Sequence, residues 1–257
     1  MSEDGNHILQ TDKATIRFGG LIAVNELTMD VRQGEIYGLI GPNGAGKTTI
    51  FNLLTGVYEP TSGDIHISGT RINGMKPYQI SRIGVSRTFQ NIRLFSSMSV
   101  LENVITACHR HSKQNLVDAV FRLPGYHRDE KEHRDFALEL LRIFDLEKYK
   151  DEAGTSLPYG NQRRLEIVRA LATRPQLLLL DEPAAGMNPS EQEDLTGLIK
   201  EVRDKFNLTI VLVEHNMRVV MGVCERIQVV DYGKSIALGL PRDIKNDPKV
   251  IEAYLGD

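Results

Sequence analysis

The sequence predicts a mixed α/β fold, in which one α/β domain over residues 1–257 carries an inserted, mainly helical subdomain. Two observations predict the core. Short apolar runs alternate with helical patterns along much of the chain, and one strand-like run leads directly into a glycine-rich turn and a helix. A third observation predicts the insertion: strand-like runs disappear between about residues 97 and 156, and helical spacing replaces them.

The composition is that of an ordinary globular chain. Hydrophobic residues make up 41%, and 31 Lys and Arg against 34 Asp and Glu give a formal charge of −3, which argues against wrapping nucleic acid. The start of the sequence lacks a basic, apolar leader, and no run reaches the roughly 20 apolar residues that span a bilayer. We therefore expect a soluble, intracellular protein that meets a membrane only through a partner. Cys108 and Cys224 lie far apart and outside any CxxC pattern, which favours reduced, partly buried thiols.

Three short apolar runs bounded by polar or turn residues predict buried strands of the core: Ile36–Ile40, Leu177–Leu180 and Thr209–Val213. A helix is predicted after Asn188, because Asn188 can cap it, Pro189 suits its first turn, and the apolar residues up to Phe206 fall on one face. Tyr232-Gly233, between two further apolar runs, predicts a hairpin turn.

The insertion has apolar residues at helical spacing: Phe136, Ala137, Leu140, Leu141 and Phe144. Pro124-Gly125 is expected to interrupt its helices. The predicted subdomain therefore covers about residues 97–156 and leads up to the loop Leu157–Gln162.

The strongest motif is GPNGAGKT, Gly41–Thr48, a full match to the phosphate-binding pattern G-x-x-x-x-G-K-[ST]. It follows a predicted strand and precedes a predicted helix over Thr49–Leu54, which separates it from an ordinary glycine-rich turn. Glycines let backbone N–H groups surround phosphate oxygens, and the helix adds the positive end of its dipole. Lys47 is expected to bind the β- and γ-phosphates, and Thr48 to bind Mg²⁺.

Two further strands end in charged residues. LLLLDE places Asp181 and Glu182 at the carboxyl end of a strand, where open α/β sheets bind ligands. Beside a P-loop, Asp181 is expected to hold Mg²⁺ and Glu182 to polarise the attacking water. Without the P-loop, the same pattern is often a strand running into solvent. VLVEHN places His215 at a similar edge, where it orients the attacking water or has a structural role.

Taken together, these motifs resemble the ABC-type ATPases, the nucleotide-binding subunits of ATP-driven transporters, over nearly the whole chain. The resemblance implies a RecA-like core with an N-terminal antiparallel β subdomain. It implies that Phe18, in IRFGG, stacks on adenine, that Gln90, in RTFQN, contacts Mg²⁺ and signals to the membrane subunit, and that His215 is the switch histidine. Nucleotide contacts are implied for Gly41, Pro42, Asn43, Gly44, Ala45, Gly46, Lys47, Thr48 and Thr49.

The signature loop of this family, usually LSGGQ, corresponds to LPYGNQ, Leu157–Gln162. Pro158 replaces the serine and Tyr159 the first glycine, so contact with the γ-phosphate of the opposite subunit passes to backbone N–H groups over Tyr159–Asn161. Pro158 has no N–H to offer. Nucleotide contacts in this loop are implied for Leu157, Tyr159, Gly160 and Asn161. Asn188 stands where an aspartate is usual and keeps the capping function.

Within the family, RTFQNIRLFSSMSVLENV, LPYGNQRRLEIVRAL, DEPAAGMNP and the ending EAYLG resemble the ATPase subunits of branched-chain amino-acid importers. This implies ATP and Mg²⁺ as ligands and a second ATPase subunit, alike or related, bound head to tail. It also implies permease subunits, a solute-binding protein met indirectly, no nucleic acid, and a place on the cytoplasmic face of the cell membrane. A lipid or lipopolysaccharide exporter ATPase and a soluble ABC ATPase are the alternatives.

Overall fold

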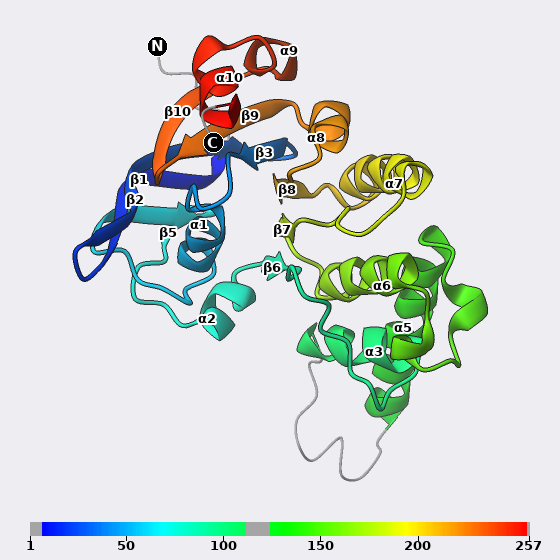
Figure 1. Ribbon diagram of the computed structural model, residues 1–257. Coiled ribbons are helices and arrows are strands. Elements are labelled where there is room, and N and C mark those ends of the chain that lie inside the picture. Colours follow the sequence, from blue (N-terminus) through cyan, green and yellow to red (C-terminus); the bar gives the residue numbers. More distant parts are fainter. Residues whose placement is uncertain (1–6, 112–123, 256–257) are drawn as a thin grey trace.

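The computed structural model describes residues 7–111 and 124–255, and the remaining residues are not considered further. A six-stranded sheet forms its centre, in the order β10-β9-β3-β8-β7-β6 (Figure 1). Strands β9, β3, β8, β7 and β6 run parallel, and β10 is antiparallel to β9. The strands are β3 (Ile36–Ile40), β6 (Val85–Arg87), β7 (Leu177–Asp181), β8 (Thr209–Val213), β9 (Arg226–Asp231) and β10 (Lys234–Gly239).

The three predicted strands are confirmed, and β7 extends one residue further, to Asp181. The predicted hairpin is confirmed as well. Tyr232 and Gly233 join β9 to β10 with φ values of 43° and 76°, the positive pair that a two-residue turn of this hand requires. The turn packs on the P-loop, because the N–H of Gly233 donates to the carbonyl of Ala45 at 2.9 Å.

A second, four-stranded antiparallel sheet combines strands from before and after the P-loop, and its N-terminal strands agree with the antiparallel β subdomain that the fold class implied. Its order is β2-β1-β4-β5, and its strands are β1 (His7–Phe18), β2 (Leu21–Arg32), β4 (Ser62–Ile67) and β5 (Thr70–Arg71). This sheet, α1 (Lys47–Leu54) and one face of the central sheet share a hydrophobic core that includes Tyr37, Leu39 and Phe51. Helix α1 begins at Lys47, two residues earlier than predicted, because the P-loop itself turns into the helix.

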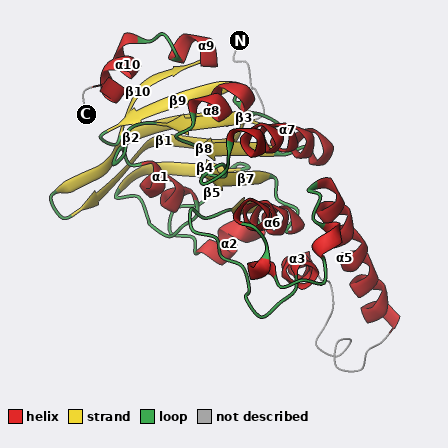
Figure 2. Cartoon of the chain, turned by 45° about the vertical axis from the view of Figure 1, so that its right-hand side comes forward, coloured by secondary structure: helices red, strands yellow, loops and turns green. Residues whose placement is uncertain are grey.

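Helices cover the other face of the central sheet (Figure 2). They include α6 (Tyr159–Ala172), α7 (Pro189–Phe206) and α8 (Met217–Val223). Alternate residues of β7 serve the two cores: Leu177 and Leu179 face the core around α1, whereas Leu178 and Leu180 face α6 and α7. Burial on both faces explains why the predicted strands are continuous apolar runs. Helix α7 begins as predicted, with Asn188 as its cap.

Between residues 97 and 156 the described chain is helical, with α3 (Val100–Cys108), α5 (Pro124–Ile143) and the short helices η1 (His109–His111), η2 (Glu147–Tyr149) and η3 (Gly154–Ser156). Helix α5 begins at Pro124, where an interruption was expected. An isolated bridge pairs Ser99 with Ala153 and brings the two ends of this segment together. Figure 1 shows the segment, with α6, as a lobe beside the central sheet.

The chain also contains α2 (Pro77–Arg82), between β5 and β6, and α9 (Pro241–Ile244) and α10 (Pro248–Leu255), which follow β10. Both cysteines are free thiols and buried, as expected, and burial raises the pKa of Cys108 to about 11. In the parts of the chain described, no helix is long and apolar enough to cross a membrane.

Candidate functional site

The P-loop joins β3 to α1 and packs tightly against neighbouring backbone. A Cβ atom at Gly41 would lie 2.0 Å from the carbonyl oxygen of Val230. One at Gly46, where φ is +100°, would lie 2.6 Å from that of Ala23. Since neither position can take a side chain, both glycines are required for the loop to fold. The loop ends at the N-terminus of α1, where unpaired N–H groups and the helix dipole favour an anion.

The side chain of Lys47 folds back into the P-loop. Its Nζ donates to the carbonyl oxygens of Gly41 and Pro42, both at 2.7 Å, and the residue is only 6% exposed. Burial lowers the pKa of Lys47, and the charges of Glu182 and Asp181 oppose that shift. The ammonium group is therefore within electrostatic reach of both predicted carboxylates. Thr48, the predicted Mg²⁺ ligand, is exposed on the first turn of α1.

Asp181 ends β7 and is buried, not directed into solvent. Its Oδ2 accepts from the guanidinium of Arg87 at 2.8 Å, and the two side chains are 4% and 7% exposed. Arg87 ends the neighbouring strand β6, donates to Asn52 of α1 at 2.7 Å, and stacks against Phe51. Sequence reasoning missed Arg87. The sequence shows an arginine at this position, but it shows neither that Arg87 ends a strand next to LLLLDE nor that its side chain is buried.

Glu182 joins two of the predicted site residues. Its Oε2 accepts from Gln90 Nε2 at 3.0 Å, and its Oε1 accepts from His215 Nε2 at 2.6 Å. Its backbone has a φ of +49°, a left-handed conformation that is strained for a residue with a side chain. Segments about 30 and 90 residues away in sequence therefore meet at one carboxylate, which the separate motifs could not show.

Glu214, directly before His215, connects the backbone segments that carry Glu182 and His215. It is buried, and its carboxylate accepts the N–H groups of Ala184 at 2.7 Å and of His215 at 3.1 Å. Burial raises the pKa of Glu214, while these hydrogen bonds oppose that shift. Glu214 thus fixes the loop after Glu182 to the segment that carries His215.

Arg163 and Glu166 of α6 form a second buried ion pair, at 2.8 Å, that sequence reasoning also missed. Arg163 donates to the carbonyl oxygens of Gln90 and Glu182 at 2.7 and 3.2 Å. Opposite charges at positions i and i+3 of a helix were visible in the sequence. That spacing is equally common on exposed helix faces, so it did not mark these residues.

Phe18 ends β1 with an exposed ring, as stacking on adenine requires. The ring meets Tyr58 edge to face, with 5.1 Å between the centroids. Tyr58 was not identified from sequence. It follows α1, and its ring packs beside that of Phe18.

The signature loop contacts the segment that follows Glu182. Helix α6 begins at Tyr159, with Pro158 before it and no side chain capping it. A Cβ atom at Gly186, where φ is +74°, would lie 2.7 Å from the ring of Tyr159, so this glycine leaves room for the tyrosine. Gly160 lies against the carboxylate of Glu191, on α7. Tyr159 itself remains 47% exposed.

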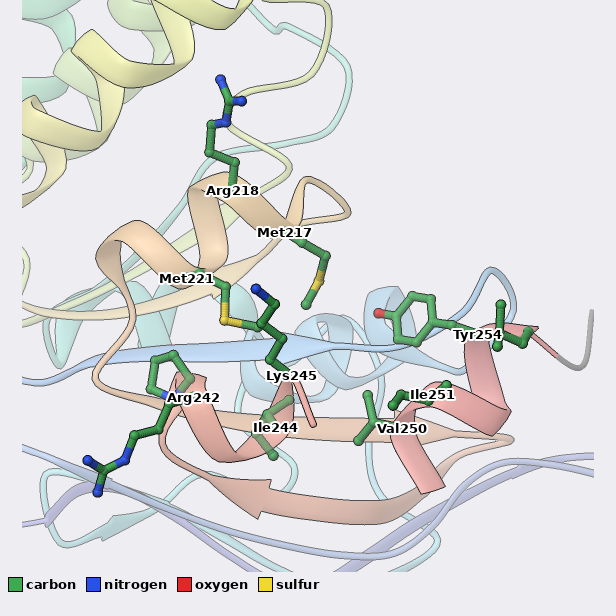
Figure 3. A pocket seen from close by; sticks show the side chains of 11 residues that line it. Met217, Arg218, Met221, Arg242, Ile244, Lys245, Val250, Ile251 and Tyr254 are labelled. Atoms are coloured by element: carbon green, nitrogen blue, oxygen red, sulfur yellow. The ribbon is translucent and has the colours of Figure 1, made fainter. Parts of the chain in front are cut away.

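A separate pocket of about 820 Å³ lies between α8 and the C-terminal helices (Figure 3). Met217 and Met221 of α8 face Ile244 of α9 and Val250 of α10 across it, while Arg218 and Arg242 point away. None of the predicted site residues lines this pocket. The predicted nucleotide site is instead the open edge of the sheet around the P-loop.

These features define a P-loop nucleotide-binding protein with a RecA-like central sheet. The family model described as "ABC transporter" matches residues 24–185, and the model "Branched-chain amino acid ATP-binding cassette transporter" matches residues 234–257. The chain belongs to the ABC transporter family, whose ATP-binding subunits are ATPases. The predicted fold class and the resemblance to this family are both confirmed.

Within this family, the chain is more similar to ATP-binding proteins of branched-chain amino-acid transport than to one of lipopolysaccharide export. The chain is 46% identical over 250 residues to the "High-affinity branched-chain amino acid transport ATP-binding protein BraF" of Pseudomonas aeruginosa, covering 97% of this chain and 98% of that one. The corresponding LivG protein of Escherichia coli gives the same identity and coverage. The lipopolysaccharide export ATP-binding protein LptB of Acidithiobacillus ferridurans is 32% identical, with 98% of both chains covered.

Solved structures agree on the fold. An ATP-binding cassette of an ABC transporter in its ADP conformation superimposes with a TM-score of 0.84 at 29% identity, covering 98% of this chain and 99% of that one. A nucleotide-free ATP-binding cassette gives the same TM-score and identity.

Proposed function

We propose that this chain hydrolyses ATP to drive import of branched-chain or related hydrophobic amino acids across the cell membrane. The observation that carries the ATPase half is the meeting of Gln90 and His215 on Glu182, next to a P-loop whose lysine lies near the same carboxylate. The substrate class rests on the 46% identity to the BraF and LivG proteins, against 32% to the lipopolysaccharide exporter ATPase.

The residues of the P-loop supply the nucleotide contacts. Backbone N–H groups over Gly41–Thr49 surround the phosphates, and Lys47 exchanges its two carbonyl partners for phosphate oxygens. The exposed ring of Phe18 stacks on adenine.

The oxygen donors of Thr48, Gln90 and Asp181 are hard ligands of the kind that Mg²⁺ prefers. When bound, Mg²⁺ neutralises charge on the phosphates. Asp181, Thr48 and Gln90 would hold the cation, and Arg87, which donates to Asp181 at 2.8 Å, would keep that carboxylate in place.

Glu182 is the general base of the proposed reaction. It accepts a proton from the water that attacks the γ-phosphate, and it needs a free oxygen to do so. Both of its oxygens are engaged in this structure, one by Gln90 and one by His215. Entry of nucleotide would turn His215 toward the γ-phosphate and the amide oxygen of Gln90 toward the cation, which frees the carboxylate for the water. Gln90 and His215 therefore report the presence of the γ-phosphate to the base.

A second ATPase subunit completes the site. Leu157, Tyr159, Gly160 and Asn161 of one subunit face the nucleotide that Gly41–Thr48 of the other subunit holds, in a head-to-tail pair. The uncapped N-terminus of α6 supports this role, because its first N–H groups have no side-chain partner.

The permease would dock in a groove of about 490 Å³ next to Gln90. Val57 and Pro77 line it from the side of α1 and α2, and Ala107 and Ala170 from the helical subdomain. Arg93 and Phe89 also line it, and the guanidinium of Arg93 lies over the ring of Phe89 at 4.2 Å from the centroid. A short amphipathic helix of a permease subunit suits this mixed apolar and cationic surface. Docking there places the chain on the cytoplasmic face of the cell membrane, with a solute-binding protein met only indirectly.

The test is reconstitution of the chain with its co-purified permease and solute-binding protein in proteoliposomes. Branched-chain amino acids should stimulate ATP hydrolysis, and Lys47→Ala should abolish it. Glu182→Gln should keep ATP binding, lose hydrolysis and accumulate as a dimer, whereas Gln90→Ala should mainly uncouple hydrolysis from transport. Vigorous turnover by Glu182→Gln would remove Glu182 from the base role. Stimulation by lipid or lipopolysaccharide and not by amino acids would establish the exporter alternative.

A further inference from the structure

Arg163 is a fully buried arginine in the first half of the helix that begins at the signature loop. Its guanidinium donates to the carbonyl of Phe89 at 2.6 Å and of Gln90 at 2.7 Å, and to the carbonyl of Glu182 at 3.2 Å. One planar group therefore ties α6 to two segments, the one that carries Gln90 and the one that carries Glu182.

Glu166, one turn further along α6, is 5% exposed and bonds both Arg163 and the segment that carries Gln90. Its Oε2 accepts from Arg163 at 2.8 Å, and its Oε1 accepts the N–H of Phe89 at 3.1 Å. Arg163 and Glu166 thus hold both the N–H and the carbonyl of Phe89. Phe89 is also a wall of the groove next to Gln90.

A buried ion pair is weak evidence for stability, because desolvation offsets most of its attraction. Apart from the bond between them, Arg163 and Glu166 form their hydrogen bonds with the backbone of other segments, not with the backbone of α6. Such bonds fix the relative position of segments that side-chain packing alone would leave free to slide.

We propose that Arg163 and Glu166 are positioning residues that make α6, Phe89–Gln90 and Glu182 move as one unit during ATP hydrolysis. A displacement of Phe89 in the groove then reaches the base through the carbonyl of Glu182, and the signature loop through the first turn of α6. This inference rests on the proposed function, since it assigns a path between the docking groove and the base.

The proposed role depends on one planar guanidinium contacting several carbonyl groups at once, so Arg163→Lys is the most direct test. Lysine keeps the charge beside Glu166, but a single ammonium cannot reach the carbonyls of Phe89, Gln90 and Glu182 together. Arg142→Lys is the matched control. Arg142 lies on α5 of the same lobe, forms a bidentate pair with Glu147 and is exposed.

Steady-state hydrolysis of Mg-ATP by the purified chain gives the first readout. We expect Arg163→Lys to lower kcat by about 10- to 100-fold, since small misplacements of a catalytic group have effects of that size. The P-loop is untouched, so KM for ATP should stay within about threefold. Arg142→Lys should leave both unchanged. An unchanged kcat in a folded Arg163→Lys protein would overturn the inference.

The second readout is a double-mutant cycle with Gln90→Ala. If Arg163 acts by placing the segment of Gln90, the double variant should hydrolyse ATP no more slowly than the slower single variant. Additive losses would mean that Arg163 acts only on general stability, which refutes the inference. Because Gln90→Ala is expected mainly to uncouple hydrolysis from transport, it can leave kcat of the purified chain unchanged, and the inference is then judged on Arg163→Lys alone.

Should Arg163→Lys fail to fold, Glu166→Gln provides the same test. Glutamine keeps the shape and still accepts the N–H of Phe89, but it removes the charge that orients the guanidinium. The expected fall in kcat with a preserved KM, and the same non-additivity with Gln90→Ala, apply to it unchanged.

Discussion

Replacing Arg87 by methionine tests the buried pair at the predicted metal ligand. The variant removes a guanidinium that contacts Asp181 and Asn52, and methionine keeps much of the contact with the ring of Phe51. Both charged side chains of the pair are under 10% exposed, so water cannot take the place of the lost partner. Breaking a buried pair on one side costs about 3–5 kcal/mol of the free energy of unfolding. We expect a loss of that size.

Urea unfolding of the nucleotide-free protein measures this loss from the shift in midpoint. Adding Asp181→Asn to Arg87→Met removes the stranded charge, and the double variant should recover about 1–3 kcal/mol relative to the simple sum of the two. Arg71→Met is the matched control. Its pair with Asp64 has a similar distance, 2.7 Å, but is exposed, so it should cost less than about 1 kcal/mol. A loss at Arg87 no larger than at Arg71, or strict additivity with Asp181→Asn, would refute the reasoning.

Three further changes have defined outcomes. Gly186→Ala forces a side chain into the left-handed region, at about 1–2 kcal/mol, and against the ring of Tyr159, so it should destabilise the protein and slow ATP hydrolysis. Tyr159→Ala should relieve only the steric part, and full relief in urea unfolding would contradict the backbone argument. Burial lowers the pKa of His133. As pH falls below about 6.5, His133 therefore takes up a proton in the unfolded chain before it does so in the folded protein. The free energy of unfolding is then lost progressively until the pH reaches the lower pKa of the folded state. His133→Leu should flatten this loss in unfolding free energies measured from pH 7 to pH 5, and an unaltered slope would count against it. Asn188→Ala removes the cap of α7 and should cost about 1 kcal/mol in the same assay, a value near zero being incompatible with the bond from Glu191 N–H.

The parts of the fold predicted from sequence are those with a local signal. Strands β3, β7 and β8 are buried on both faces, so each is an uninterrupted apolar run. Helix α7 has a polar cap and a proline at its first position. Strand β6 has three residues, and α9 has four, which is too short for any periodicity to emerge. The pairing of β1 with β4 joins residues more than 40 positions apart, and its register depends on packing that one strand does not encode.

The site shows the same division. The roles of Lys47, Asp181 and Glu182 could be predicted because phosphate chemistry imposes their residue types and spacing. Arg87 and Arg163 were missed because a sequence records a charge but not its burial. Their partners are a carboxylate about 90 positions away for Arg87 and backbone carbonyls for Arg163, and backbone carbonyls leave no trace in residue type.

The unusual signature loop can be understood from the same contacts. Pro158 removes a hydroxyl and an N–H, yet α6 still begins at Tyr159 with no side chain on its first N–H groups. An uncapped helix N-terminus attracts an anion, and the carboxylate of Glu191 lies beside this one. Its Oε1 would lie 3.2 Å from a Cβ at Gly160, while its Oε2 accepts the N–H of Asn188 at 2.9 Å. In the dimer that we propose, the phosphate held by the second subunit would share this helix end with the carboxylate of Glu191. Binding of the phosphate and the position of Glu191 at the start of α7 are consequently coupled. We therefore propose that the loss of the serine moves phosphate recognition from a hydroxyl to the N-terminus of α6, next to the segment that follows Glu182.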